Sequence, residues 1–209
     1  MPNTSGNSYA LTTFCPIRNG HKNGIPNYSL TRRKLQELPE NESSPMARVD
    51  NTYLARFYIL DDAIFLSSPN KLDKLQSKYL VFTSDFHGDL DTYLIGMWNS
   101  INQDIQHIWA DCVGFEKVNS AQSFVEYIKK CQLYTTFFFN GSTDEPLQEQ
   151  LKSLFLKQEF SKFVFAHQGV PPGQLLNDFK DFIAWTKPKI LGSPTWKAGA
   201  CSLDGVCEK

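Results

Sequence analysis

Four stretches of the chain either alternate apolar and polar positions or concentrate aromatic and aliphatic residues, as β-strands do. They are residues 9–17 (YALTTFCPI), 52–60 (TYLARFYIL), 78–86 (KYLVFTSDF) and 107–115 (HIWADCVGF). Apolar residues spaced by three and four predict a short helix over residues 30–38, which Pro39 ends, and a longer helix over residues 89–106. The first 115 residues therefore predict the order strand, helix, strand, strand, helix, strand of a ferredoxin-like unit.

This order predicts an α+β fold, in which residues 8–115 form a ferredoxin-like antiparallel sheet with both helices on one face. The second face of such a sheet then needs a partner. The sequence leaves three partners open: another sheet that closes an α+β barrel, a second subunit, or more of the same chain.

Residues 116–188 have the same character with less regularity. The patterns predict helices at residues 121–131, 144–158 and 175–185, and a short strand at 134–139. Asp144 is suited to cap the second of these helices, and residues 162–167 fit either a strand or a helix tail. Residues 189–209 form a tail rich in Gly and Ser. Because the polar loops are short and no internal repeat is visible, we expect residues 1–209 to form a single compact domain.

Charge and composition narrow the class of protein. Lys and Arg number 21 and Asp and Glu 22, so the chain lacks the basic surplus that nucleic-acid binding uses. No signal peptide and no membrane-spanning run of about 20 apolar residues is visible. The five cysteines are scattered and odd in number, which favours a reducing compartment over a disulfide framework. We therefore expect a cytoplasmic protein without nucleic-acid or membrane partners.

The densest group of polar residues is Ser84–Asp91, between a predicted strand and the longest predicted helix. There, His87 is a candidate general base that Asp85 would orient, and both are our candidate catalytic residues. The structural alternative is that Asp89 caps the helix. Alternate acidic residues in this segment suggest a calcium loop, but its spacing lacks the required Gly and Glu, and no metal site is predicted.

Two further residues are candidates for binding. Arg56 lies in the middle of a predicted strand, where it either points to solvent or holds an anionic group of a ligand. His167 follows an apolar run and is either a structural residue or an axial haem ligand. The chain has no Walker A, Gly-x-Gly-x-x-Gly, Gly-x-Ser-x-Gly or His-Glu-x-x-His motif, so the usual signals of nucleotide, dinucleotide, hydrolase and zinc-protease chemistry are missing.

Three stretches, residues 9–17, 54–62 and 79–94, resemble uncharacterised bacterial proteins of the dimeric α+β-barrel superfamily. The strand-to-helix junction of those proteins often reads Phe-Asp-Gly, where this chain has Phe86-His87-Gly88. The superfamily includes dye-decolorising peroxidases, stress-responsive barrel proteins and small monooxygenases. The resemblance implies a sheet whose open face closes a barrel with a second sheet. Haem peroxidase activity is not implied, because the Gly-x-x-Asp-Gly motif of the peroxidases is missing.

Two functions follow as hypotheses. The first is a protein that binds a small apolar or aromatic molecule in the barrel, with oxidoreductase-like chemistry and with Arg56, Asp85 and His87 as polar anchors. Haem is one such molecule, although the sequence specifies no cofactor. The second is a non-catalytic module whose open sheet face serves homodimerisation or another protein interaction. Whether the protein is an enzyme stays open at this point.

Overall fold

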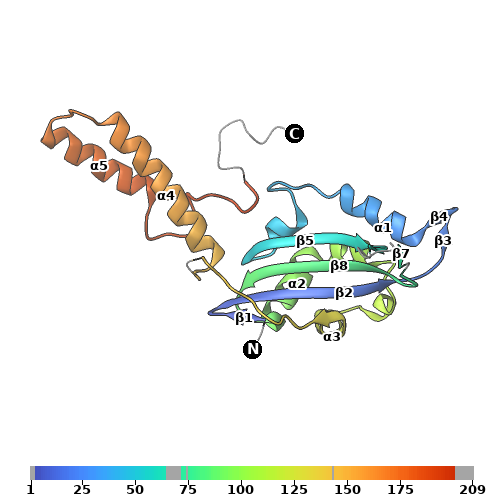
Figure 1. Cartoon of the computed structure of the whole chain (residues 1–209). Helices are drawn as coiled ribbons and strands as arrows, with labels where there is room; N and C mark the ends of the chain where they lie inside the picture. Colours follow the sequence, from blue (N-terminus) through green and yellow to red (C-terminus); the bar gives the residue numbers. More distant parts are fainter. Residues whose placement is uncertain (1–2, 65–71, 74, 143, 201–209) are drawn as a thin grey trace. The chain divides into compact units, whose positions relative to one another are not determined.

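A computed structural model describes residues 3–64, 72–73, 75–142 and 144–200 of the chain. It divides into two compact units, residues 1–144 and residues 145–209 (Figure 1). The boundary follows Asp144, whereas the sequence patterns change near residue 115. Each unit is described by itself below.

The first unit is built on an antiparallel sheet whose three long strands are β2 (Ser8–Ile17), β5 (Thr52–Leu60) and β8 (Lys78–His87). Strand β8 lies between the other two and runs antiparallel to both. Because α1 (Asn27–Gln36) connects β2 to β5, these elements form the predicted split β-α-β unit. Two short strands, β1 (Thr4–Ser5) and β9 (Gln132–Leu133), also pair with β2.

Helices α1, α2 (Leu90–Trp109) and α3 (Ala121–Cys131) pack on one face of this sheet. Alternate strand residues point at them, among which Phe82 and Phe57 stack with ring centroids 4.6 Å apart. Trp109 stands edge-on to both rings. At the start of α2, the side chain of Asp89 accepts a hydrogen bond of 3.0 Å from the backbone N–H of Thr92, as the sequence predicted. The α+β fold with helices on one face is therefore confirmed.

The remaining short elements of the first unit lie in its connections. They are β3 (His21–Lys22), β4 (Ile25–Pro26), β6 (Ala63–Ile64), β7 (Leu72–Asp73) and the 3₁₀ helices η1 (Pro45–Arg48) and η2 (Phe115–Lys117).

The predicted strand at residues 107–115 is wrong. Helix α2 continues to Trp109, and a turn and η2 follow. The apolar stripe of α2 extends through Ile105, Ile108 and Trp109, so that helical spacing prevails over the apparent alternation. Only a single bridge, between Ile17 and Cys112, remains at the place of the fourth strand. The sheet is consequently open and does not close into a barrel.

The predicted strand at residues 134–139 is also wrong, because regular pairing ends with β9 at Leu133. Phe137 and Phe139 are largely exposed, so no apolar surface holds this segment as a strand. Polar contacts fix it instead. The backbone N–H of Thr135 donates to Asn3 over 3.1 Å, and the Asn140 amide donates to Ser8 over 2.7 Å.

Asp144 does not cap the following helix, contrary to the prediction. Its carboxylate accepts hydrogen bonds from the backbone N–H of Asn7, the nearer at 2.8 Å, and from the Ser8 hydroxyl at 3.0 Å. These bonds lower the pKa of Asp144. Gly6 makes the approach possible, because a Cβ at this position would lie 2.2 Å from a carboxylate oxygen of Asp144.

The second unit consists of α4 (Leu147–Ala166) and α5 (Pro172–Thr186), which form a helical hairpin. Helix α4 begins after Pro146 and runs eight residues beyond the predicted end at residue 158. Residues 162–166 are therefore the end of this helix and not a strand, and His167 follows it, which settles the alternative left open by the sequence.

Candidate functional site

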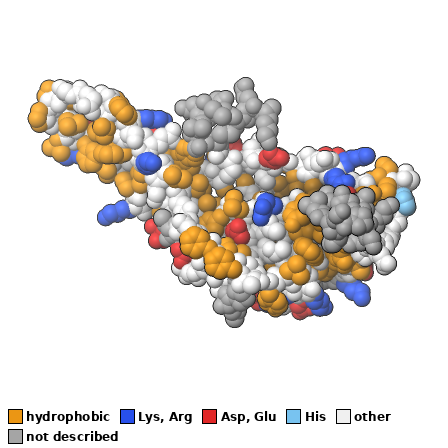
Figure 2. Space-filling view, viewed as in Figure 1, with side chains coloured by type: hydrophobic (Ala, Val, Ile, Leu, Met, Phe, Trp, Pro, Cys, Tyr) orange, Lys and Arg blue, Asp and Glu red, His pale blue; other side chains and the backbone are white. Residues whose placement is uncertain are grey.

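Arg56, Asp85 and His87 lie on the face of the sheet opposite the helices. Side chains alternate along β8, so Asp85 and His87 point away from the core that Phe86 enters. Arg56 pairs with Thr83 in the register between β5 and β8, which places it on the same open face. Figure 2 shows this face, with charged side chains among hydrophobic ones over the sheet. The fold thus collects the three candidate residues on one surface.

Arg56 and Asp85 interact on this face. The Arg56 Nε donates a hydrogen bond of 3.3 Å to the hydroxyl of Thr83. Partial burial raises the pKa of Asp85, and the positive charge of Arg56 offsets only part of this effect. The two residues therefore form a loose charge pair, with a guanidinium that is exposed to solvent.

His87 contacts Tyr53 and not Asp85, the residue that would orient it in a catalytic His–Asp pair. Its Nδ1 lies 3.1 Å from the hydroxyl of Tyr53, and the two rings meet edge to face. A cavity of about 280 Å³ lies beside it, at the junction of β8 and α2. Its walls are formed by Val49, Asp50, Asn51, His87, Gly88, Asp89, Thr92, Tyr93, Gly96 and Ser100. Its volume is just below the usual range of ligand pockets, about 300–1,000 Å³, and neither Arg56 nor Asp85 lines it.

We expect Asp85→Asn to stabilise the protein slightly at neutral pH. The folded-state pKa of Asp85 is raised, so the folded protein prefers the protonated carboxyl, and ionisation costs stability as the pH rises through that pKa. The gain should be about 0.5 kcal/mol or less, because solvent screens a partly exposed group. It should vanish below the unfolded pKa of about 4. Urea unfolding at pH 7 and pH 3 measures both values.

Glu126→Gln is the matched control, since Glu126 is an exposed carboxyl on α3. It should leave the free energy of unfolding unchanged at both pH values. A loss of stability in Asp85→Asn at pH 7 would show that the attraction to Arg56 outweighs the cost of burial.

The hairpin carries a feature that the sequence analysis missed. Aromatic rings on α4 and α5 form a seam along the two helices, with Phe163 and Phe182 centroids 5.0 Å apart and Phe155 and Trp185 centroids 5.9 Å apart. At its end the ring of His167 stacks on Phe163 at 4.0 Å. The signal was available in the sequence, because apolar residues are spread over all sides of α4 and are mixed with polar ones, so the helix has no separate polar face.

Most of the apolar surface of the hairpin is uncovered. Within the described part of residues 145–200, the only buried side chains are those of Lys152 and Thr186, and no apolar side chain is buried. Nine large apolar side chains of α4 and α5 are exposed: Leu154, Phe160, Val164, Phe165, Leu175, Leu176, Phe179, Ile183 and Trp185. Exposed apolar patches of several hundred Å² occur at protein and membrane interaction sites and in ligand-binding grooves, so the hairpin is a candidate binding surface.

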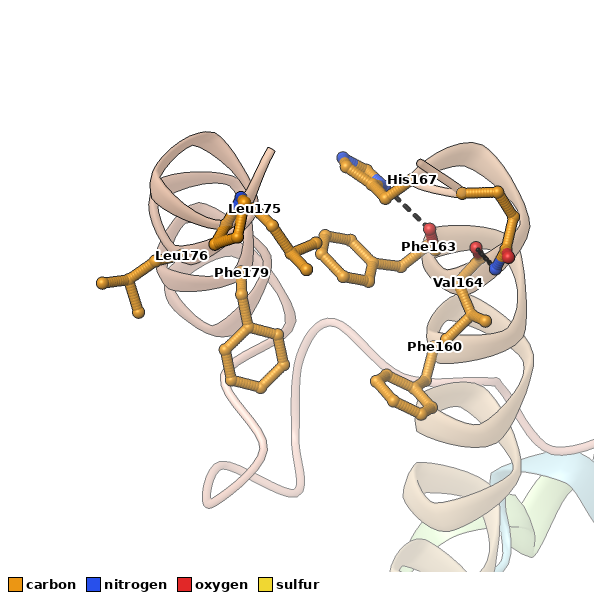
Figure 3. A pocket seen from close by; sticks show the side chains of 9 residues that line it. Phe160, Phe163, Val164, His167, Leu175, Leu176 and Phe179 are labelled. Atoms are coloured by element: carbon orange, nitrogen blue, oxygen red, sulfur yellow. Dashed lines mark hydrogen bonds between the residues drawn. The ribbon is translucent and has the colours of Figure 1, made fainter. Parts of the chain in front are cut away.

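A groove of about 510 Å³ runs between the two helices. Figure 3 shows the rings of Phe160 and Phe163 on α4 facing Leu175 and Phe179 on α5, while Leu176 points away from the groove. His167 lies at its rim. Both ring nitrogens have protein partners, since Nδ1 lies 2.7 Å from the carbonyl of Phe163 and Nε2 lies 3.5 Å from Asp178. His167 thus joins the end of α4 to α5 and offers no free nitrogen to a haem iron.

The described ranges contain neither a metal-binding cluster nor a membrane-spanning helix. No three His, Cys, Asp or Glu side chains there are placed to hold a metal ion. In the same part of the chain, no helix has the length and apolar character needed to cross a membrane.

Comparisons with protein-family models, curated proteins and solved structures give no match to this chain. The resemblance of residues 9–17, 54–62 and 79–94 to the dimeric α+β-barrel superfamily therefore stays a prediction from those residues alone, and the family of the chain is not assigned.

Proposed function

We propose that this protein is an interaction protein without catalytic activity, and that the α4–α5 hairpin joins two copies of the chain into a homodimer. The observation that supports this most is the second unit's lack of a core, because its helices expose nine large apolar side chains and bury none. An isolated pair of helices with such a surface is poorly stable in water, since helical stability comes mainly from packing of an apolar face. A second hairpin would supply that packing.

The exposed area is sufficient for a stable interface. An aromatic side chain buries about 150–250 Å² when it is fully covered. On that scale, and with the exposed fractions of the nine side chains, the hairpin presents on the order of 800 Å² of apolar surface, which matches one partner's share of a standard interface. Two hairpins packed together would form a four-helix bundle, which is a common way of burying such surfaces.

The charges of the two helices favour a second copy over an unrelated partner. Helix α4 carries three Lys and two Glu, a net charge of +1, and α5 carries two Asp and one Lys, a net charge of −1. A two-fold symmetric dimer in which α4 of one copy packs on α5 of the other would bring these opposite net charges together.

Sedimentation velocity and native mass spectrometry test this proposal. The unaltered protein should sediment at twice the monomer mass. The double variant Phe165→Glu with Leu176→Glu replaces the most exposed apolar residue of each helix. Because each buried anchor contributes about 2 kcal/mol or more, this variant should weaken dimerisation by roughly a hundredfold or more.

Leu54→Glu is the matched control. Leu54 is 65% exposed on β5 and lies on the open face of the sheet, so the substitution places a glutamate at an exposed apolar position outside the hairpin. It should leave the dimer intact. A dimer that dissociates in Leu54→Glu and persists in the hairpin variant would assign the interface to the sheet. A monomer in solution whose hairpin binds anionic lipid vesicles would overturn the proposal.

A second candidate function is binding of a small apolar or aromatic molecule, which the groove between α4 and α5 supports. Its volume of about 510 Å³ lies within the range of ligand pockets, about 300–1,000 Å³. Native mass spectrometry separates the two functions. A co-purifying small molecule that Phe163→Ala releases, on a protein of monomer mass, would favour ligand binding. A cytoplasmic location without nucleic-acid or membrane partners stays a prediction from the sequence.

A further inference from the structure

Three cysteines that lie far apart in the sequence meet inside the first unit. Cys15 is on β2, Cys112 follows α2 and Cys131 ends α3, and all three are free thiols. Sheet pairing brings them together. The bridge between Ile17 and Cys112 places Cys112 beside β2, and the pairing of β9 with β2 begins one residue after Cys131.

Two buried hydrogen-bond donors lie beside these sulfurs. The Nε1 of Trp109 and the hydroxyl of Tyr127 are buried and have no hydrogen-bond partner. The indole of Trp109 acts to lower the pKa of the Cys15 thiol, and the hydroxyl of Tyr127 acts to lower those of Cys112 and Cys131, as donors near a sulfur do. A buried donor without an acceptor is costly, so a sulfur that accepts is favourable here, and more so when it carries a negative charge.

The three thiols differ in acidity and access. The Cys15 thiol donates to the Thr13 hydroxyl over 3.8 Å. The neighbouring thiols of Cys15 and Cys131 shift each other's pKa, which is raised for Cys15 and lowered for Cys131. Burial raises the pKa of Cys112 to about 12. Cys131 is also the only one of the three with partial exposure, whereas Cys15 and Cys112 are fully buried. Cys131 is therefore the thiol that a small oxidant reaches, and Cys15 is its neighbour.

We propose that Cys131 and Cys15 form a peroxide-sensitive pair that closes into a disulfide. The Cys131 thiolate attacks hydrogen peroxide, the O–O bond breaks, and Cys131 becomes a sulfenic acid while hydroxide leaves and takes up a proton. The sulfur of Cys15 then displaces the second hydroxide and the S–S bond forms. Two thiols lose two electrons and two protons, and one peroxide molecule becomes two molecules of water. The proposal does not depend on the hairpin or on dimerisation.

The bond would join α3 and β9 to the central strand β2, because Cys15 lies on that strand and Cys131 at the end of α3. It would close a loop of more than a hundred residues, which strongly restricts the unfolded chain. The midpoint of thermal unfolding should therefore rise by roughly 10 °C on oxidation and return when dithiothreitol reduces the bond.

The test uses the full chain with Cys201→Ser and Cys207→Ser, so that thiols outside the described residues do not react. The folded protein is treated with hydrogen peroxide, its remaining thiols are alkylated after unfolding, and the intact mass and tryptic peptides are measured. We expect a loss of two hydrogen atoms and a linked peptide pair containing Cys15 and Cys131. Cys15→Ala and Cys131→Ser should both abolish it, and Cys112→Ser should retain it.

Tyr127→Phe distinguishes a thiol site from simple proximity, because it removes the donor and retains the ring. This variant should slow disulfide formation several-fold, since the Tyr127 hydroxyl no longer lowers the pKa of Cys131. Its circular dichroism spectrum should match that of the unaltered protein. A peroxide-treated protein without the linked peptides, or with Cys112 in the bond, would overturn the proposal. Equal rates in Tyr127→Phe would do so too.

Discussion

Trp109→Ala should destabilise the first unit by roughly 3–5 kcal/mol, which is a large part of the stability of a typical domain. The indole is fully buried and its ring lies 5.5 Å from the centroids of both Phe57 and Phe82 and 5.8 Å from that of Phe124. It joins the sheet to α2 and α3. Removing it leaves a cavity that the surrounding backbone cannot close, so these aromatic contacts are lost together.

Urea unfolding followed by far-ultraviolet circular dichroism measures this loss, because tryptophan fluorescence changes with the substitution itself. Phe137→Ala is the control: an aromatic side chain of the same unit is removed at a position where it is 79% exposed. The control should cost about 1 kcal/mol or less. A cost below 1 kcal/mol for Trp109→Ala would show that the aromatic cluster is not the centre of the core.

Lys152→Ala should release the segment that follows α5, at a cost of roughly 3 kcal/mol to the local stability of the hairpin. Lys152 is 1% exposed, and its Nζ donates hydrogen bonds of 2.7 Å to the carbonyl of Thr186 and 2.6 Å to that of Pro194. Burial and the nearby Lys187 lower the pKa of the amine. Without Lys152, two carbonyls lose a charged donor and the end of α5 loses one of its contacts with α4.

Hydrogen–deuterium exchange of residues 183–200 reports this change directly. The amides of this segment should exchange faster in Lys152→Ala, and those of β2 and β8 should exchange at unaltered rates. Lys157→Ala, an exposed lysine one turn further along α4, is the control and should behave as the unaltered protein. Equal protection of residues 183–200 in both variants would mean that other contacts hold the segment.

The sequence alone determined those helices, strands and caps that depend only on residues close together along the chain. The strands at 52–60 and 78–86, the cap at Asp89 and the helix from there onward follow from side-chain alternation, helical spacing and one capping carboxylate. The alternation of β8 also determined that Asp85 and His87 share one face. These are properties of a few neighbouring residues, so the sequence alone determines them.

Tertiary structure decided what depends on residues far apart. The alternation at residues 107–115 predicted a strand, but Ile108 and Trp109 are buried in the core as part of helix α2. A short alternating pattern does not show against which part of the fold its apolar residues will pack. Tyr53 is the partner of His87 because β5 and β8 pair. Asp144, which the sequence suited to cap a helix, instead accepts hydrogen bonds from Asn7 and Ser8.

The proposed dimer of the hairpin and the proposed Cys15–Cys131 pair were also invisible in the sequence, because both depend on how distant segments pack. The composition shows many Phe residues, but only the packing shows that Phe and other apolar side chains of the hairpin are exposed. The sequence spaces Cys15 and Cys131 more than a hundred residues apart, and pairing of β9 with β2 brings them together. Contacts between distant residues arise when the whole sheet and its helices pack, and for that reason the local sequence could not contain them.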